Sequence, residues 1–234
     1  MSALRTGPAF GVIVAAGRSE RMGGADKIFA PMMGRPLITW TLAAFRNCPE
    51  IDGVVVVAAP DALERMTLLL HEWRVPDVVD VVPGGPRRQD SVRAGIEAAA
   101  NATIVAIHDG ARPLVTPALI TTGIDLARET GAAICAVRAR DTVKEVEGEP
   151  ATVVATHDRA RIWLAQTPQV FDRELLLRAY AASNDDATDD AALVERLGHP
   201  VRVYEGEMSN LKVTTRDDLV IAETLMRARL DGER

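Results

Sequence analysis

The chain has 234 residues, a hydrophobic fraction of 47% and a formal net charge of −6. This length fits one α/β domain or two small ones, and the apolar content is sufficient for a full core. The negative charge argues against nonspecific nucleic-acid binding, and the lack of any apolar run of ~18 residues argues against a membrane span.

Cysteine and histidine usage favours a reducing compartment and argues against a zinc centre. Cys48 and Cys135 lie far apart in the sequence, so free thiols are expected. The four histidines form no cluster with metal-ligand spacing. The N-terminal residues before Phe10 contain no long apolar segment of the kind that secretory signals carry. We therefore expect a cytoplasmic protein.

A buried parallel strand is predicted at 10–16, and the residues that follow it favour phosphate binding. The strand ends in the small residues Ala15, Ala16 and Gly17, where a ligand can approach the backbone N–H groups. The next loop carries three cations, Arg18, Arg21 and Lys27. An ordinary solvated basic turn is the alternative to a polyphosphate site.

Strands and helices then alternate along the chain. Helical spacing begins at Leu37, a buried strand is expected at 53–59, a helix opens at Pro60, and a short strand spans 77–82. Because no hairpin signal interrupts this pattern, it predicts a doubly wound, mostly parallel sheet. Ligands of such sheets bind beyond the carboxyl ends of the strands, where the loop after Gly17 lies.

The loop at 83–91 predicts a second part of the ligand site. Gly84 and Gly85 permit close backbone approach, and the Ser91 hydroxyl offers a hydrogen bond, which suits a nucleoside base or ribose. The alternative is a plain strand-to-helix loop with Asp90 or Ser91 as the N-cap of the next helix. We assign the cap to Asp90.

A carboxylate ends the next predicted strand, at 103–108. Asp109 beside a glycine suits a ribose hydroxyl or a metal ion. One aspartate is too few ligands for a protein-built cage, but Mg²⁺ commonly binds one or two carboxylates together with substrate phosphates. Arg112 is expected either to pair with Asp109 or to bind a second phosphate.

The alternation breaks at about 138–166, after a helix from Thr116 and a strand at 132–137. Two polar-apolar segments there flank Gly148-Glu149-Pro150, which predicts a protruding β-hairpin. A two-stranded ribbon is marginal on its own, so a second subunit is a candidate support.

The C-terminal part returns to helices and one strand. Helices are expected from Asp172 and Asp189, a strand at 201–204, and a last helix after a capping-box pattern at Thr215. Lys212 lies just outside that helix and is one of only three lysines among 27 basic residues. An ammonium and a guanidinium are not interchangeable at a tight site, so the three lysines are candidates for positions where arginine does not fit. Chance survival in an arginine-rich composition is the alternative.

Several motif classes are absent: the P-loop pattern G-x-x-x-x-G-K-[ST], G-x-G-x-x-G after the first strand, and the G-x-S-x-G elbow. The chain instead resembles the 2-C-methyl-D-erythritol 4-phosphate cytidylyltransferase family over nearly its whole length. The resemblance rests on motifs in register: VAAGRSERMGGADK, GGPRRQDSV, HDGARP, RDTVK, THDR, QTPQVF, TDDAALVE and NLKVT.

The resemblance implies a single Rossmann-like nucleotidyltransferase domain over 1–234 with a β-arm at about 138–166. It also implies a homodimer formed through the arm, a divalent cation (usually Mg²⁺), and two substrates, CTP and a sugar-alcohol phosphate. The reaction would join CTP and 2-C-methyl-D-erythritol 4-phosphate in the non-mevalonate isoprenoid pathway. No nucleic acid or membrane partner is implied.

The resemblance also implies residue roles. The catalytic residues would be Arg21, Lys27, Arg159 and Lys212. The nucleotide would be bound by Ala15, Ala16, Gly17, Arg18, Gly84, Gly85, Arg88, Ser91 and Asp109, with Asp109 also as the candidate metal contact. The acceptor would be bound by Arg112, Thr142, Thr167 and Thr188, and Thr142 and Arg159 would reach the partner's site.

Two other functions stay open at this stage. A cytidylyltransferase for another alditol phosphate, such as ribitol 5-phosphate, would need a similar acceptor pocket. A non-catalytic nucleotide-binding protein on the same scaffold is the second alternative. The chain departs from many family members at Asp26 and Ile28, which flank the first lysine, and from some at Pro86, where they carry an acidic residue. Asp26 adds a negative charge beside the expected triphosphate loop, and Ile28 lacks the amide that those members have.

Overall fold

The computed structural model describes residues 5–17, 27–75, 77–182 and 186–232. Within them, a sheet of seven strands has the order β11-β7-β10-β6-β1-β4-β5. Neighbouring strands are parallel except around β10, which runs antiparallel to β6 and β7. The predicted mostly parallel α/β sheet is confirmed. The strands are β1 (Ala9–Ala15), β4 (Gly53–Ala58), β5 (Val78–Pro83), β6 (Ile104–Asp109), β7 (Ala132–Arg138), β10 (Trp163–Asp172) and β11 (Arg202–Glu205).

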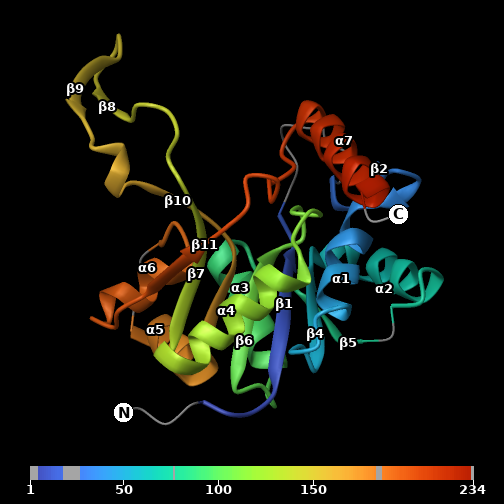
Figure 1. Ribbon diagram of the computed structural model, residues 1–234. Helices are drawn as coiled ribbons and strands as arrows, with labels where there is room; N and C mark the ends of the chain where they lie inside the picture. The colour runs from blue at the N-terminus through green and yellow to red at the C-terminus, as the bar shows by residue number, and fades with distance from the viewer. Residues whose placement is uncertain (1–4, 18–26, 76, 183–185, 233–234) are drawn as a thin grey trace.

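Helices cover both faces of this sheet (Figure 1). Three of them, α1, α2 and α4, share one apolar cluster with the sheet, and α3, α5 and α6 share the other. The helices are α1 (Leu37–Arg46), α2 (Leu63–Glu72), α3 (Arg88–Ala98), α4 (Pro117–Thr130), α5 (Arg173–Ala182), α6 (Asp190–Arg196) and α7 (Arg216–Gly232).

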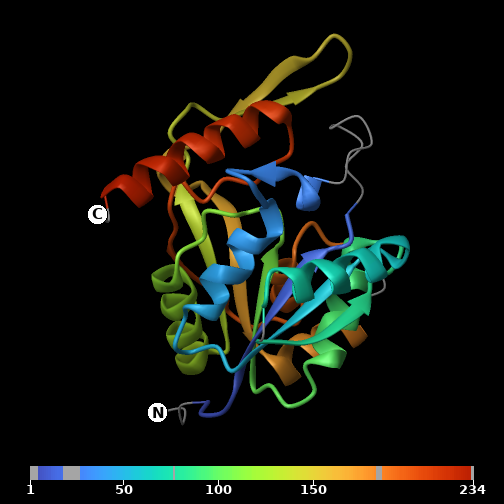
Figure 2. The same ribbon diagram turned by 90° about the vertical axis from the view of Figure 1, so that its right-hand side faces the viewer.

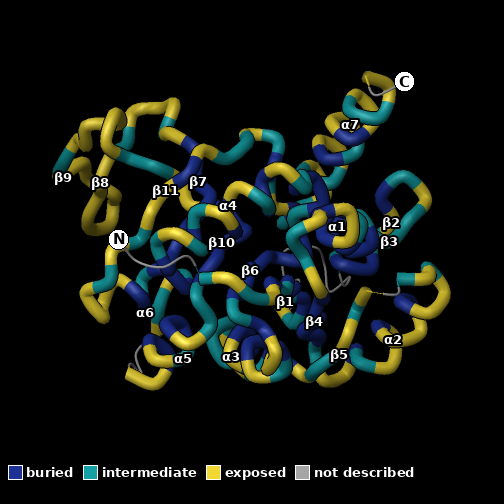
Figure 3. The backbone as a smooth tube through the Cα atoms, turned by 60° about the horizontal axis from the view of Figure 1, so that its bottom comes forward, coloured by how far each residue is buried: buried dark blue, intermediate teal, exposed yellow. Residues whose placement is uncertain are grey.

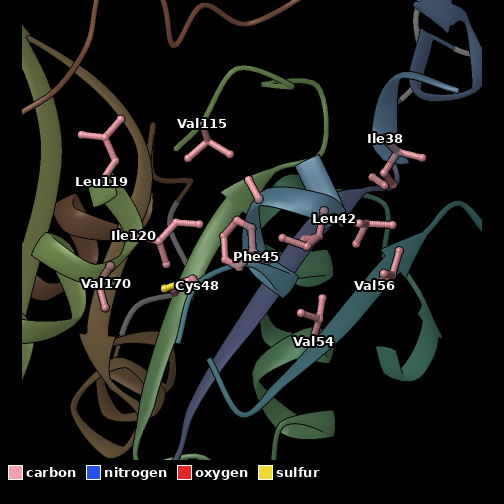
Figure 4. Packing of buried hydrophobic residues seen from close by; sticks show 14 of the residues in the cluster. Ile38, Leu42, Phe45, Cys48, Val54, Val56, Val115, Leu119, Ile120 and Val170 are labelled. Carbon is pink, nitrogen blue, oxygen red and sulfur yellow. The ribbon is translucent and has the colours of Figure 1, made fainter. Parts of the chain in front are cut away.

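Successive side chains of a strand point to opposite faces of the sheet, so each central strand contributes residues to both apolar clusters. In β4, Val54 and Val56 face the cluster of α1, α2 and α4, whereas Val55 and Val57 face that of α3. Figure 4 shows the first cluster with the fully buried Phe45 of α1 in its midst. Strands buried on both faces explain why the sequence reads as continuous apolar runs.

One central strand is missing from the sequence prediction. β10 pairs with β6 and β7, whereas the sequence analysis assigned its first residues to the arm and expected no strand before the helix at Asp172. Pro168 explains the error, because proline cannot donate to a ladder and argues against a central strand. The structure accommodates it at an irregularity, where the pairing with β7 breaks between Ala165 and Gln169.

The arm consists of residues 139–162 between β7 and β10. Its strands β8 (Lys144–Glu147) and β9 (Thr152–Thr156) pair antiparallel in a separate two-stranded sheet, as predicted. The arm projects from the same end of the molecule as α7 (Figures 1 and 2), and its residues are mostly exposed (Figure 3). Within the expected arm region of about 138–166, Arg138 is the last residue of β7 and residues 163–166 are the first of β10.

Helix α7 adds a third, small core at this end of the molecule. It covers a hairpin of β2 (Pro31–Met32) and β3 (Arg35–Pro36) that follows the 3₁₀ turn η2 (Lys27–Phe29). The predicted capping box is confirmed, because Thr215 Oγ1 accepts the Asp218 N–H at 3.1 Å and Asp218 Oδ2 accepts the Thr215 N–H at 2.8 Å. The members of this core are Met32, Leu37, Leu114, Val213, Ala222 and Met226.

Helix α3 begins before the residue assigned as its cap. Its first residue is Arg88 and its N-cap is Arg87. Asp90 caps the helix from inside the first turn, because its Oδ2 accepts the Arg87 N–H at 3.1 Å and its Oδ1 pairs with the Arg87 guanidinium at 2.8 Å.

Both cysteines are free and buried, as expected from the sequence. Among the described residues, each helix is too short or too polar to cross a bilayer.

Candidate active site

A cleft of about 860 Å³ opens where β1, β4, β5 and β6 end. This size is typical of small-molecule sites, which hold roughly 300–1,000 Å³. Pro60 and Asp61, which follow β4, line the cleft and were not predicted as site residues. The predicted site residues that the cleft brings together are Ala15, Ala16, Gly17, Lys27, Gly84, Gly85, Arg88, Ser91, Asp109 and Lys212.

The two glycines after β5 form one wall of the cleft. A Cβ on Gly84 would lie 2.4 Å from the Ala16 Cβ and 2.7 Å from Ser91 Oγ, so only glycine fits there. Ser91 Oγ accepts the Gly85 N–H at 3.1 Å and lies 3.2 Å from the Arg87 carbonyl. The Ser91 hydroxyl therefore also shapes this loop.

Asp109 gathers three cations at the end of β6. Its Oδ2 lies 3.0 Å from Lys212 Nζ and 3.4 Å from Arg112 Nε, and its Oδ1 lies 3.9 Å from Arg88 Nε. Burial alone would raise the pKa of Asp109, but the charges of Lys212, Arg88 and Arg112 outweigh it and lower the pKa to about 2. The carboxylate is therefore ionised near neutral pH and orders the cations around it.

Thr167 and His108 fix the backbone beneath Asp109. Thr167 Oγ1 accepts the Asp109 N–H at 3.1 Å and lies 3.0 Å from His108 Nδ1. The Arg112 carbonyl can only accept, so the His108 proton is on Nε2, which donates to this carbonyl at 3.3 Å. Nδ1 of the neutral ring is then an acceptor, and the Thr167 hydroxyl donates to it. Burial lowers the pKa of His108 to about 4, so the ring is neutral at physiological pH.

Asn210 anchors the segment that carries Lys212. This buried side chain donates from Nδ2 to the Thr167 carbonyl at 2.8 Å, and the main-chain carbonyl of Asn210 accepts from Arg112 Nη1 at 2.7 Å. The irregular part of β10 is therefore tied to both Arg112 and Lys212. The sequence analysis did not assign Asn210, although it lies in the NLKVT motif.

Five predicted site residues among the described parts of the chain do not line the cleft, and two of them, Arg112 and Thr167, contact Asp109. Thr142 and Arg159 are exposed on the arm and do not line the cleft of their own chain. Thr188 is exposed in the segment before α6. Arg18 and Arg21 fall outside the residues that the structure describes.

The departure at Ile28 has a structural explanation. Its side chain is buried in the main core cluster and also lines the cleft beside Lys27. An amide at this position would lie among apolar groups. Asp26 lies outside the described residues.

The described donors fit Mg²⁺ only as a companion of a polyphosphate ligand. No group of three or more His, Cys, Asp or Glu side chains that could hold a metal occurs among the described residues. The cleft offers the carboxylates of Asp109 and Asp61. Because Mg²⁺ keeps several waters and needs few protein oxygens when phosphates are present, this sparse set is compatible with it.

Comparisons with known proteins agree on one family. The family model for 2-C-methyl-D-erythritol 4-phosphate cytidylyltransferase matches residues 10–228. A relative of that name from Dehalococcoides mccartyi is 44% identical over 216 residues, which cover 92% of this chain and 95% of the relative. Another, from Symbiobacterium thermophilum, is 44% identical and covers 92% of this chain and 91% of its own.

Solved structures show the same likeness. The crystal structure of the enzyme of that name from Thermus thermophilus has a TM-score of 0.76 and 36% identity, covering 92% of this chain and 98% of its own. The 4-diphosphocytidyl-2C-methyl-D-erythritol synthase from Anaerococcus prevotii has a TM-score of 0.83 and 29% identity, with coverage of 94% and 96%.

Proposed function

This chain belongs to the 2-C-methyl-D-erythritol 4-phosphate cytidylyltransferase family, and on that basis we propose that its cleft joins CTP to this sugar-alcohol phosphate in isoprenoid precursor synthesis. A phosphate oxygen of the acceptor attacks the α-phosphorus of CTP. The bond from that phosphorus to the bridging oxygen of the β-phosphate breaks, and pyrophosphate leaves. The second product is 4-diphosphocytidyl-2-C-methyl-D-erythritol.

The observation that carries this proposal is the cluster of Lys212, Arg112 and Arg88 around Asp109. Asp109, Lys212 and Arg88 line the same cleft as the two glycines. Because the acceptor phosphate is already anionic, the reaction needs no general base. Catalysis then consists of positioning two anions and offsetting the charge that develops on the leaving pyrophosphate.

The nucleotide occupies the part of the cleft between β1 and the glycine wall. Gly84 and Gly85 allow the cytosine to approach the backbone, and the N-terminal loop with Lys27 and Arg21 holds the triphosphate. Asp109 lies where it can accept a ribose hydroxyl. Mg²⁺, held mainly by the phosphates with Asp109 nearby, would neutralise part of their charge.

The acceptor lies on the Lys212 and Arg112 side of Asp109. Thr167 supports this side from below, while Thr142 and Arg159 would come from a partner subunit. Exposed valines on the arm support the homodimer, because a lone two-stranded ribbon is marginally stable and its apolar side chains need a partner surface. They are Val146 (51% exposed), Val153 (54%) and Val154 (50%).

We place the reaction in the cytoplasm, where CTP is available. The two buried thiols are unpaired, as a reducing compartment would keep them.

A pyrophosphate-release assay with CTP tests the reaction and its acceptor. The purified chain is incubated with Mg²⁺ and either 2-C-methyl-D-erythritol 4-phosphate or ribitol 5-phosphate, and the cytidylyl product is identified by mass. We expect turnover with the first acceptor. Faster turnover with ribitol 5-phosphate would reassign the substrate, and CTP binding without pyrophosphate release would indicate a non-catalytic nucleotide-binding protein.

A further inference from the structure

A buried carboxylate and a tyrosine lie behind the cleft wall and were given no role in the sequence analysis. Asp190, the first residue of α6, is 1% exposed. Its Oδ2 lies 2.8 Å from Arg88 Nη2, and its Oδ1 accepts the hydroxyl of Tyr180 at 2.5 Å. Tyr180 belongs to α5, so α5 and α6, which share one face of the sheet with α3, converge on a single side chain of the cleft.

Two carboxylates, those of Asp190 and Asp109, lie near the guanidinium of Arg88. Asp190 holds one end of its guanidinium, while Asp109 lies 3.9 Å from Nε at the other end. Asp109 is also bonded to Lys212 at 3.0 Å. If Asp190 lost its charge, Asp109 would become the carboxylate nearest to Arg88. The guanidinium would then shift toward Asp109, across the floor of the cleft.

Arg88 and Tyr180 keep their protonation states over a wide pH range. Burial alone would lower the pKa of Arg88, but the charge and hydrogen bond of Asp190, together with the charge of Asp109, outweigh burial and raise the pKa. Burial and the same carboxylate raise the pKa of Tyr180 well above its ordinary value. Tyr180 is therefore always a donor and Arg88 always a cation near neutral pH.

We propose that Asp190 and Tyr180 are positioning residues for the nucleotide, because they hold Arg88 on the cleft wall and away from Asp109. The inference rests on the proposed function, in which Asp109 accepts a ribose hydroxyl of CTP and Arg88 belongs to the cation cluster around Asp109. Neither Asp190 nor Tyr180 lines the cleft, so both act through Arg88.

A purely structural role would have a different signature. Removing one partner of a buried ion pair lowers stability whether or not the pair serves a ligand. A positioning role additionally weakens CTP binding in the folded protein. The two roles can be distinguished by measuring both the Kd for CTP and the free energy of unfolding in each variant. The variants must lower stability for different reasons.

The test compares Asp190→Asn and Tyr180→Phe with the control Asp172→Asn. Asp172 Oδ2 lies 3.2 Å from Arg5 Nε, so the substitution removes one charge of a partly buried ion pair at the start of the helix that carries Tyr180. An asparagine Oδ1 can still accept the Leu175 N–H that caps this helix. It pairs with Ile104 at the opposite end of β6 from Asp109, far from the cleft. The Kd for CTP is measured by calorimetry without acceptor, the KM of each substrate by pyrophosphate release, and stability by urea unfolding.

We expect Asp190→Asn to raise the Kd for CTP about tenfold, the effect typical of losing a hydrogen bond to a charged group. Its KM for CTP should rise at least about fivefold more than its KM for the acceptor. Tyr180→Phe keeps the charge pair and should raise the Kd about threefold, as for a neutral donor. Asp172→Asn should lower stability with the Kd unchanged.

A folded Asp190→Asn variant with the wild-type Kd for CTP would overturn the proposal, as would an equal rise in Kd for Asp172→Asn. Should Asp190→Asn not fold, Tyr180→Phe decides alone: an unchanged Kd refutes the positioning role. Failure of the proposed function is recognised separately, because the wild-type chain would then release no pyrophosphate whatever the variants bind.

Discussion

The buried histidine beneath the cleft makes the stability of this protein depend on pH. His108 is fully buried, against the ring of Phe45 at 5.3 Å between centroids, and near the charges of Asp109, Arg112 and Lys212. Burial lowers its pKa from 6.5 to about 4. Between pH 6.5 and about pH 4, His108 is therefore mostly neutral in the native state, whereas the same ring is mostly protonated in the unfolded chain.

The sign and the size of the effect follow from linkage. Because the folded pKa is depressed, the stabilisation is fully present above pH 6.5 and is lost as the pH falls toward 4. One pKa unit corresponds to about 1.4 kcal/mol, so the difference between the unfolded and folded pKa values of His108 corresponds to about 3 kcal/mol of unfolding free energy. Between pH 7.5 and pH 5, titration of the unfolded chain alone should remove about 2 kcal/mol. Asp109, with a pKa of about 2, does not titrate in this range.

The assay is urea unfolding followed by circular dichroism from pH 7.5 to pH 5, without nucleotide or divalent cation. The comparison variant is His108→Gln, which keeps an acceptor and a donor but has no titration. It should be less stable at pH 7.5 and should lose about 2 kcal/mol less than the wild type on acidification. Equal pH dependence of the two proteins, or a wild type that is more stable at pH 5, would refute the reasoning.

Three further changes test other parts of the site. Lys27→Ala should lower kcat about 10²–10³-fold with an unchanged circular dichroism spectrum, as for loss of one charge-stabilising contact; full kcat would remove Lys27 from catalysis. Arg159→Ala should raise the KM of the sugar phosphate more than that of CTP, and the reverse pattern would contradict its place at the acceptor. Glu223→Ala should lower the free energy of unfolding in urea by about 1 kcal/mol, because its Oε1 accepts a main-chain N–H of the β2–β3 turn at 2.8 Å. An unchanged midpoint would show that this bond contributes nothing.

Much of the fold could be predicted because its signals are local. Buried parallel strands read as short apolar runs, and the carboxyl ends of such strands meet at one edge of the sheet. Gly84 and Asp109 follow different strands, yet the sequence predicted them in one site, and the structure places both in the cleft. The hairpin of the arm and the cap at Thr215 were equally local and were found.

The errors have non-local causes. β10 was not predicted, because Pro168 argues against a central strand. Only the pairing with the neighbouring strand β7 shows that an irregularity accommodates this proline inside the sheet. The ion pair of Asp190 with Arg88 joins residues 102 positions apart, and their sequence contexts indicate only a helix start in each case. Long-range polar pairs of this kind leave no periodic pattern, so composition and spacing could not reveal them.

The arrangement around Asp109 explains how an acidic protein can hold two anionic substrates. Lys212, Arg112 and Arg88 would repel one another in an empty cleft, and one central carboxylate lets all three stay close. Asp190 offsets Arg88 from outside the cleft, so it balances charge without occupying space that a ligand needs. The excess of three cations over two carboxylates is thereby concentrated at the end of β6, while the chain as a whole keeps its net negative charge.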